Sequence, residues 1–461
     1  MTTKFENGLF IFRRDFRIID NNALSLLNER CKHVYTIFIF TPEQVGSKNK
    51  YKSDNSVQFM IESLQDLAGK VSKAGGQLYT FFGHNEKVVE QCIQAFDIDV
   101  VCFNLDITPY AKERDAKIIQ VCERTETYVM YDHDYYLHEP GTITNATGGE
   151  YQKFTPYYEA ALKKQVDPPV GPRKIRFKQS GATVSNKITL EDALHKFTHV
   201  NPDILVHGGR DNAIKQMKSA AKNIQHYPQT HNMLTHPTSQ LSAYIKFGCV
   251  SIREVYKTFR SKRDFIRQLF WRDFYASVLY SFPHVLGHAM KPKYDKVKWH
   301  YNERWFDAWC NGKTGFPVVD AGMRQLNQTG YMHNRARLIV ASFLVKTLLI
   351  DWKKGEQYFA TKLTDYDPAS NNLNWQWCAS SAVDSQPYFR IFNPWRQTDN
   401  FDPDCEYIKQ WVSELANVPA KDILNWETIW ANYSNIGYTK PICDYNIQKE
   451  KALAMLGAVY K

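Results

Sequence analysis

The chain has 461 residues, of which 43% are hydrophobic and 14% aromatic, and it carries a formal net charge of +10. This composition supports a large apolar core and excludes a disordered chain, while the length indicates more than one domain. The positive charge points toward a polyanionic partner, and no stretch approaches the roughly 20 apolar residues that a membrane span requires.

The number and spacing of the cysteines indicate the cellular compartment of the protein. The nine cysteines are odd in number, widely spaced, and contain no C-x-x-C pair. They predict reduced thiols in a cytoplasmic or nuclear protein and neither a disulfide framework nor a zinc site. The first apolar run, Leu9–Phe12, is too short for a signal peptide, and the histidines lack the spacing of metal ligands.

The first part of the chain alternates apolar runs with helical patterns. Buried strands are predicted at Leu9–Phe12, Val34–Phe40, Leu78–Phe82 and Val100–Phe103, with amphipathic helices at Ser56–Ala74 and Glu86–Phe96. Strand–helix alternation predicts a Rossmann-like α/β domain over residues 1–135, with a parallel sheet. No G-x-G-x-x-G follows the first strand. A charged turn, Arg13–Arg17, stands there instead, where ligands bind in such sheets.

Two further segments follow. Residues 136–200 are rich in turn signals, such as Pro140-Gly141 and Pro168-Pro169, and are predicted to form an interdomain connector. Helical patterns dominate residues 201–461. All eleven tryptophans lie between Trp271 and Trp430, which indicates a part that handles electrons or flat aromatic ligands, or a bulky helical core.

Several motifs in the helical part could carry chemistry. Thr238–Ser242 places three hydroxyls before an apolar stretch, which suits phosphate binding or a helix N-cap. Gln268, Trp271, Arg272 and Tyr275 share one helix face that could stack on a base, or form a core stripe with an arginine rim. Three more motifs are Tyr331–Arg337, Asp365–Trp377 and Pro387–Pro394.

Taken in order, these motifs resemble the photolyase/cryptochrome family over essentially the whole chain. M-H-N-R at 332–335 and N-W-Q-W at 374–377 are most similar to class I cyclobutane pyrimidine dimer photolyases. The resemblance implies the photolyase fold, with an α/β antenna-binding domain and an all-α domain that binds FAD. It also implies UV-damaged DNA as the partner of a monomeric enzyme.

The resemblance implies a role for each motif residue. Arg337 and Asp365 would pair beside the isoalloxazine, Asp367 would lie along the flavin, and Asn371 would face its N5. The other cofactor-binding residues implied are Tyr227, Thr238, Ser239, Gln240, Leu241, Ser242 and Arg272. Trp375, Trp352 and Trp299 would form an electron relay from flavin to surface. The lesion or DNA contacts implied are Gln268, Trp271, Asn334, Arg335, Trp377, Arg390 and Gln397.

The implied reaction is light-driven electron transfer. Reduced FADH⁻, excited by blue or near-UV light, would donate an electron to a flipped-out dimer, which splits into two pyrimidines. Trp375, Trp352, Trp299, Asn371 and Gln268 are the catalytic residues that the resemblance implies.

Some positions depart from the dimer photolyase pattern. Gln268 stands where dimer photolyases usually carry a Glu, and (6-4) photolyases carry Gln at the same place. Asn334, however, stands where (6-4) photolyases carry a His. Leu338 stands where a Met is common in the family, and Tyr331 stands where a Trp is frequent. A (6-4) or dual-specificity photolyase, a blue-light-receptor cryptochrome and a single-strand-preferring DASH protein therefore remain alternatives. The stretch 106–114 lacks the folate-binding Asn-Glu pair, which leaves the antenna open among a deazaflavin, a folate and another flavin.

Overall fold

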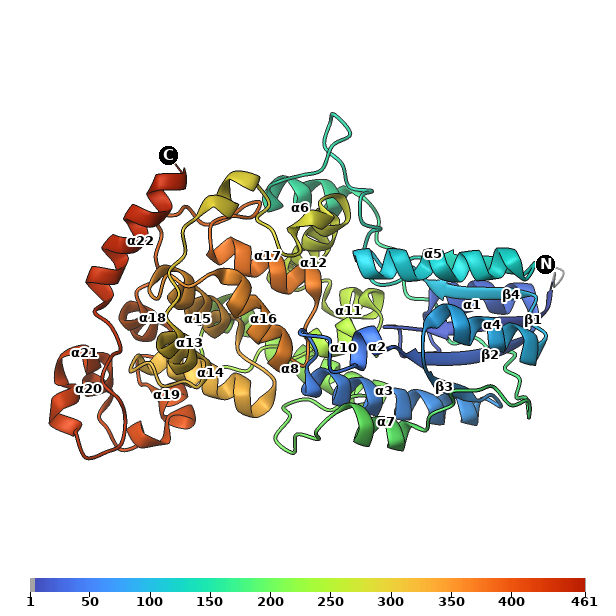
Figure 1. Cartoon of the computed structure of the whole chain (residues 1–461), viewed down its shortest axis with the longest axis horizontal. Helices are drawn as coiled ribbons and strands as arrows, with labels where there is room; N and C mark the ends of the chain where they lie inside the picture. The colour runs from blue at the N-terminus through green and yellow to red at the C-terminus, as the bar shows by residue number, and fades with distance from the viewer. Residues whose placement is uncertain (1–4, 461) are drawn as a thin grey trace. The chain divides into compact units, whose positions relative to one another are not determined.

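The computed structural model describes residues 5–460, which divide into two compact units (Figure 1). Unit 1 contains the described residues up to Pro202, together with Val206–Gln225 and Ser239–Pro283. Unit 2 contains Asp203–Leu205, His226–Thr238 and the described residues from His284 onward. This division differs from the predicted segments 1–135, 136–200 and 201–461, because contacts group Val206–Gln225 and Ser239–Pro283 with the sheet.

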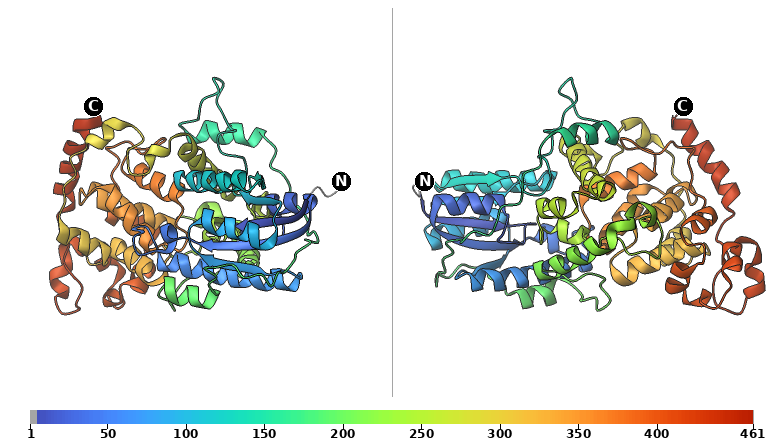
Figure 2. Two further views of the ribbon diagram at one scale, coloured as in Figure 1. Left: turned by 45° about the vertical axis from the view of Figure 1, so that its right-hand side comes forward. Right: turned by 180° about the vertical axis from the view of Figure 1, so that it is seen from behind.

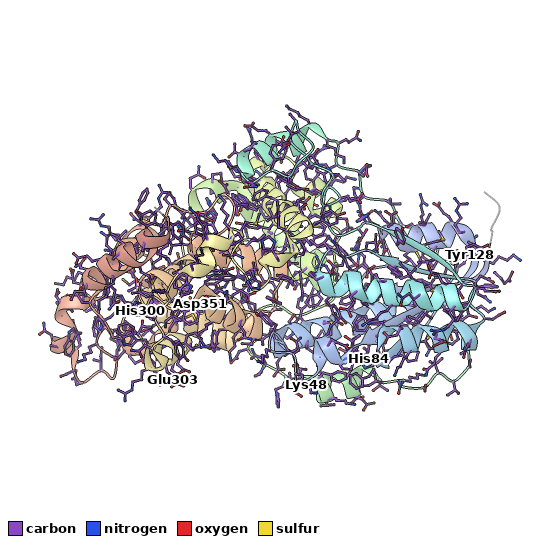
Figure 3. The ribbon with its side chains drawn as sticks, turned by 45° about the horizontal axis from the view of Figure 1, so that its top comes forward. Lys48, His84, Tyr128, His300, Glu303 and Asp351 are labelled. Carbon is purple, nitrogen blue, oxygen red and sulfur yellow. The ribbon has the colours of Figure 1, made fainter. Side chains whose placement is uncertain are left out.

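Unit 1 is built on a parallel sheet of five strands in the order β3-β2-β1-β4-β5. The strands are β1 (Phe5–Phe12), β2 (Cys31–Phe40), β3 (Leu78–Phe82), β4 (Val100–Asn104) and β5 (Tyr128–Asp132). The four predicted strands are confirmed, although β1 and β2 begin earlier. β5 was not predicted, because it is a half-exposed edge strand without a buried apolar run. Its Tyr128, labelled in Figure 3, is 57% exposed.

Both faces of the sheet are covered by helices, as the views in Figure 2 show. Alternate residues such as Leu9 and Ile37 pack with Val88 and Ile118 of helices on one face. Phe10 and Phe38, which point to the other face, are also buried. The predicted parallel α/β architecture is therefore confirmed. The helices of unit 1 are α1 (Asn22–Arg30), α2 (Pro42–Val45), α3 (Asp54–Lys73), α4 (Asn85–Phe96), α5 (Pro109–Arg124), α6 (Phe154–Lys163), α7 (Leu190–Phe197), α8 (Arg210–Asn223), α10 (Ser242–Lys246), α11 (Ile252–Phe259) and α12 (Arg263–Ser281).

The predicted connector packs on the rest of unit 1. Its α6 contributes Phe154 and Tyr157, both buried, to the contact with α12. Farther on, the N–H of Lys178 donates to the carbonyl of Val34, and the N–H of Ile188 donates to that of Thr80. The segment therefore belongs structurally to the α/β unit.

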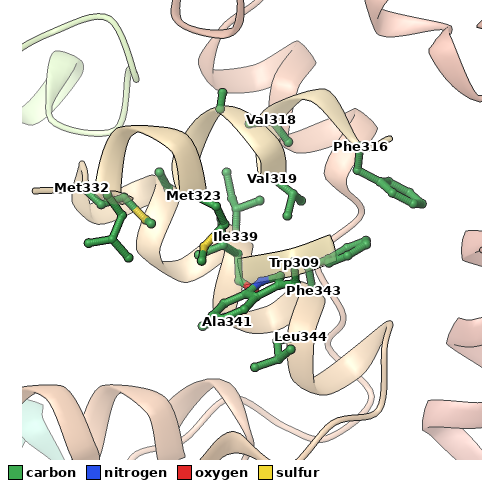
Figure 4. Close-up of a cluster of buried hydrophobic side chains, with 14 of the residues drawn as sticks. Trp309, Phe316, Val318, Val319, Met323, Met332, Ile339, Ala341, Phe343 and Leu344 are labelled. Carbon is green, nitrogen blue, oxygen red and sulfur yellow. The ribbon is translucent and has the colours of Figure 1, made fainter. Parts of the chain in front are cut away.

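Unit 2 is helical. Its core forms around Trp309, which is fully buried and donates its indole N–H to the carbonyl of Val340 at 3.0 Å (Figure 4). The α-helices are α9 (Tyr227–Thr230), α13 (Glu303–Cys310), α14 (Pro317–Thr329), α15 (Asn334–Lys346), α16 (Trp352–Lys362), α17 (Pro368–Cys378), α18 (Pro394–Phe401), α19 (Glu406–Trp411), α20 (Ala420–Leu424), α21 (Trp426–Ile429) and α22 (Tyr445–Tyr460). The short 3₁₀ helices η3 (Pro292–Lys296), η4 (Ser413–Leu415) and η5 (Trp430–Tyr433) also lie in unit 2, whereas η1 (Ile224–His226) and η2 (Pro283–Val285) span the bounds between the units.

Candidate cofactor and DNA site

Arg337 and Asp365 form a bidentate ion pair in unit 2. Nη2 of Arg337 lies 2.9 Å from Oδ2 of Asp365, Nη1 lies 3.2 Å from Oδ1, and Nε donates to the carbonyl of Met332. Burial by itself lowers the pKa of Arg337, but the Asp365 carboxylate outweighs it, so the net pKa is raised. The ion pair therefore ties α15 to the turn that precedes α17.

Asn371 lies one turn into α17, which starts at a well-formed cap. Asp367 is the N-cap and accepts the N–H of Ser370, while Pro368 occupies the first turn, where its missing N–H costs nothing. The side-chain nitrogen of Asn371 donates to the backbone oxygen and to Oε1 of Glu356, each at 3.1 Å. The amide oxygen of Asn371 is thereby presented as an acceptor. Glu356 was missed in the sequence, since nothing in its local pattern distinguishes it from a surface carboxylate.

Two of the three predicted relay tryptophans are buried in unit 2. Trp375 on α17 and Trp352 on α16 are each 2% exposed, while Trp299 is half-buried. The indole of Trp375 packs directly on Gly355 of α16, where an added Cβ would lie 2.3 Å from Cη2. Gly355 thus places Trp375 against the helix that carries Trp352. Trp309, which the prediction did not assign to the site, also has its ring centroid 6.1 Å from that of Trp375.

The predicted DNA-contacting residues of unit 2 differ in exposure and in the hydrogen bonds that they already make. Asn334, at the start of α15, and Arg390 are exposed, and Trp377 is half-buried. Arg335 is instead engaged, since its guanidinium donates to Oδ1 of Asn232 at 2.7 Å and lies over the ring of Phe401. Oε1 of the half-buried Gln397 has no hydrogen-bond partner among residues 5–460.

The predicted residues of α12 in unit 1 do not form a uniform face. Gln268 is exposed and donates to the carbonyl of Asp264, whereas Tyr275 is buried. Trp271 stacks on Phe154 with centroids 3.8 Å apart and 8° between planes, so one face of its indole is covered. Arg272 donates to the carbonyl of Tyr135 at 2.6 Å.

The hydroxyl segment is split between the units. In unit 2, the hydroxyls of Thr238 and Tyr331 lie 3.2 Å apart, and Tyr227 stacks on His231 with ring centroids 5.0 Å apart. In unit 1, Gln240 has a left-handed φ of 52°, and α10 begins at the exposed Ser242. Ser239 accepts the N–H of the buried Leu241 through Oγ, so its hydroxyl also stabilises the turn.

A buried cationic cluster lies at the carboxyl end of β1 and β4. Arg13 and Arg114 share one carboxylate, Asp115, at 2.8 and 2.9 Å, and the Arg13 guanidinium lies over the ring of Phe103. Burial, and then the charge of Arg114, lower the pKa of Arg13. Within residues 5–460, Nε and Nη2 of Arg13, Nη2 of Arg114 and Oδ2 of Asp115 have no hydrogen-bond partner. The predicted charged turn is therefore part of a donor-rich site.

The described part of the chain contains neither a metal-binding cluster nor a membrane-spanning helix. No group of His, Cys, Asp and Glu side chains in residues 5–460 could hold a metal ion. In the same range, no helix combines the length and the apolar character needed to cross a membrane.

Known proteins match both parts of the chain. A family model described as DNA photolyase matches residues 9–173, and one described as the FAD binding domain of DNA photolyase matches residues 265–458. A deoxyribodipyrimidine photo-lyase of Halobacterium salinarum is 32% identical over 97% of this chain and 98% of its own length.

Two solved structures are similar in fold and sequence. The archaeal photolyase of Sulfolobus tokodaii, crystallised with two FAD molecules, has a TM-score of 0.89 and 38% identity over 98% of this chain and all of its own. A class III photolyase of Agrobacterium tumefaciens has a TM-score of 0.91 and 31% identity, covering 100% of this chain and 98% of its own. The chain therefore belongs to the photolyase/cryptochrome family.

Proposed function

We propose that this protein is a deoxyribodipyrimidine photo-lyase, which binds FAD and uses light to split cyclobutane pyrimidine dimers in UV-damaged DNA. The observation that carries the proposal is the similarity, over nearly the whole chain, to relatives that bear that name. The protein acts as a monomer in the cytoplasm or nucleus.

The residues of unit 2 fit a flavin. Reduced FAD, when bound, supplies the electron that opens the dimer under blue or near-UV light. The Arg337–Asp365 pair provides a fixed, charge-balanced wall, and Oδ1 of Asn371 is oriented to accept a hydrogen bond from a protonated ring nitrogen. Tyr227 and Thr238 would hold the phosphate and ribityl parts. The contributions of Ser239–Ser242, Asp367 and Arg272 are proposed from the family motifs.

The residues proposed to contact the lesion combine an aromatic ring with polar groups. Trp377 is half-buried and offers a ring for stacking, while the exposed Asn334 and Arg390 offer an amide and a cation. A dimer must leave the duplex before it can stack on a protein ring, and this unstacking costs least at a damaged pair. Cationic contacts to phosphates make such binding dependent on salt.

The class I assignment and the lesion preference are part of the proposal. M-H-N-R and N-W-Q-W favour class I and the cyclobutane dimer. Gln268 favours a second candidate, repair of (6-4) products, because (6-4) photolyases carry Gln at this position. Dimer photolyases usually carry a Glu there, whose acidic proton an amide lacks.

The experiment uses the full chain, loaded with FAD and reduced beforehand, and two duplexes. One duplex carries a single thymine dimer and the other a (6-4) product, and repair is followed under blue light and in the dark. Light-dependent repair of the dimer alone supports the proposal. Repair of the (6-4) product supports the second candidate. Photoreducible FAD without repair of either lesion would identify a photoreceptor and reject both.

We further propose that the Arg13–Arg114–Asp115 cluster binds the antenna chromophore through acceptor-rich or anionic groups. The guanidinium N–H groups of Arg13 and Arg114 that lack a partner within residues 5–460 favour an anionic deazaflavin or a phosphate-bearing flavin over a cationic folate. Chromophores released from the purified protein, and excitation spectra of flavin reduction after reconstitution with FAD or a deazaflavin, test this. Retention of a folate alone would reject it.

A further inference from the structure

A buried lysine ends helix α15. Lys346 is 1% exposed, and its Nζ donates to Oγ of Ser380 and to the backbone oxygen of Arg390, each at 2.9 Å. Both acceptors are neutral oxygens. An ammonium group held by neutral acceptors inside a protein loses much of its hydration, so its presence in the core requires a compensating role.

The two acceptors belong to segments that carry proposed DNA contacts. Ser380 follows the end of α17 in a left-handed conformation with φ 64°, and its N–H donates to the carbonyl of Trp377 at 3.2 Å. Arg390 lies in the irregular segment between α17 and α18. Lys346 therefore joins the end of the Trp377 helix to the backbone of Arg390.

A second bond on the same face of α15 supports this arrangement. Ser342, one turn before Lys346, accepts the N–H of Phe392 through Oγ at 3.4 Å. The two bonds hold the segment at Arg390 and Phe392 by its backbone. The Arg390 guanidinium remains at the surface, where it donates to Gln386 at 2.9 Å.

We infer that Lys346 is a positioning residue for damaged DNA, which holds the Trp377 end of α17 and the Arg390 segment in one arrangement before the lesion binds. The inference rests on the proposed function. A segment that is already ordered loses less conformational entropy on binding than one that must be ordered by the ligand. The expected contribution is to affinity for the lesion and not to the electron-transfer step.

The test compares Lys346→Met with the wild type, using the full FAD-loaded chain. Methionine keeps the length of the side chain but cannot donate. Lys421→Met, which removes an exposed lysine of α20, is the control for loss of one positive charge. Dissociation constants are measured for a dimer-containing duplex and for the undamaged duplex, together with FAD content and repair yield at saturating DNA.

We expect the affinity of Lys346→Met for the damaged duplex to fall about tenfold, as for the loss of a charged hydrogen bond. Affinity for undamaged DNA, FAD content and repair yield at saturation should stay close to wild type. Unchanged affinity for damaged DNA in a folded, FAD-bound variant overturns the inference, and so does an equal loss on both duplexes.

If Lys346→Met does not fold, Ser380→Ala removes one of the two acceptors and leaves the lysine in place. A selective loss of affinity for damaged DNA, smaller than tenfold, is then expected, and unchanged affinity overturns the inference. Measurements on the wild type distinguish failure of this inference from failure of the proposed function. A wild-type protein without any preference for damaged DNA contradicts the proposed function itself.

Discussion

The side-chain nitrogen of Asn371 lies 3.1 Å from both the backbone oxygen and Oε1 of Glu356. Glu356 is 3% exposed, so this contact is made inside unit 2. The contact fixes which end of the amide is offered to a ligand.

We expect Glu356→Met to weaken the preference for reduced flavin, because the Asn371 amide loses one of its two acceptors and is held only by the backbone oxygen of residue 356. A typical hydrogen bond is worth roughly 0.5–1.5 kcal/mol, so air reoxidation of the reduced flavin should be about two- to tenfold faster. The absorbance of the flavin after photoreduction measures this. Glu356→Gln keeps Oε1 and serves as the control. Equal reoxidation rates in all three proteins would contradict the role of Glu356.

Trp377→Ala should weaken binding of damaged DNA far more than binding of undamaged DNA. Stacking of a base on an aromatic ring is worth about 1–3 kcal/mol, which predicts a loss of about tenfold or more for the damaged duplex. Electrophoretic mobility or fluorescence anisotropy measures both affinities. Trp430→Ala, at an exposed tryptophan, is the control. An equal loss on both duplexes would remove Trp377 from the lesion pocket.

Trp299→Phe should slow photoreduction of oxidised flavin at least about tenfold and spare repair by chemically reduced enzyme. Phenylalanine is much harder to oxidise than tryptophan, while the packing of the half-buried ring is largely kept. Trp305→Phe, on the neighbouring helix, is the matched control. Photoreduction at the wild-type rate in Trp299→Phe would mean that another ring ends the relay, and Trp309 is then the first to replace.

Gln268→Glu should raise the quantum yield of dimer repair. The carboxyl group restores the residue that dimer photolyases usually carry, and its exposed position on α12 makes the exchange compatible with folding. The yield is measured under blue light on a duplex with one thymine dimer, with repair of a (6-4) product as the comparison. A lower dimer yield would indicate a site built for another lesion.

Lys346 should make stability rise with pH. Burial lowers the pKa of Lys346 from 10.5 to about 8, so between these pH values the unfolded chain binds one proton more than the folded chain. Unfolding free energy then increases with pH, and the difference between 10.5 and about 8 corresponds to about 3 kcal/mol. This contribution is complete above pH 10.5 and is lost as pH falls through 8.

Denaturant unfolding, followed by tryptophan fluorescence from pH 7 to pH 10.5, checks this prediction. Lys346→Met lacks the titrating group, so its stability relative to wild type should decrease steadily across this range. Lys421→Met is measured alongside as the control for loss of one positive charge. A pH-independent difference between Lys346→Met and wild type would show that the buried lysine keeps its ordinary pKa.

The sheet could be predicted because its central strands are buried on both faces. Continuous apolar runs such as Val34–Phe40 leave few alternatives to a buried strand. Tyr128–Asp132 lies at the edge of the sheet and has no such run. The individual contacts of the connector could not be predicted, since its buried residues, such as Phe154, are separated by turn signals.

The site could be predicted only in part. Arg337 and Asp365 are 28 positions apart, and the resemblance to a family linked them before the structure did. Nothing in the local sequence connects Asn371 to Glu356, or Lys346 to Arg390, because these contacts depend on how helices pack. The engaged state of Arg335 was missed for the same reason, since its partner Asn232 is remote in the sequence.

Gly355 sets the separation of the two helices that carry Trp352 and Trp375. A methyl group at this position would overlap the Trp375 indole and the Leu344 side chain, so any other residue must displace the indole or its helix. Tunnelling between redox centres weakens exponentially with distance. In the proposed relay, a side chain at position 355 that displaces the Trp375 indole would therefore change the rate of electron transfer through that indole.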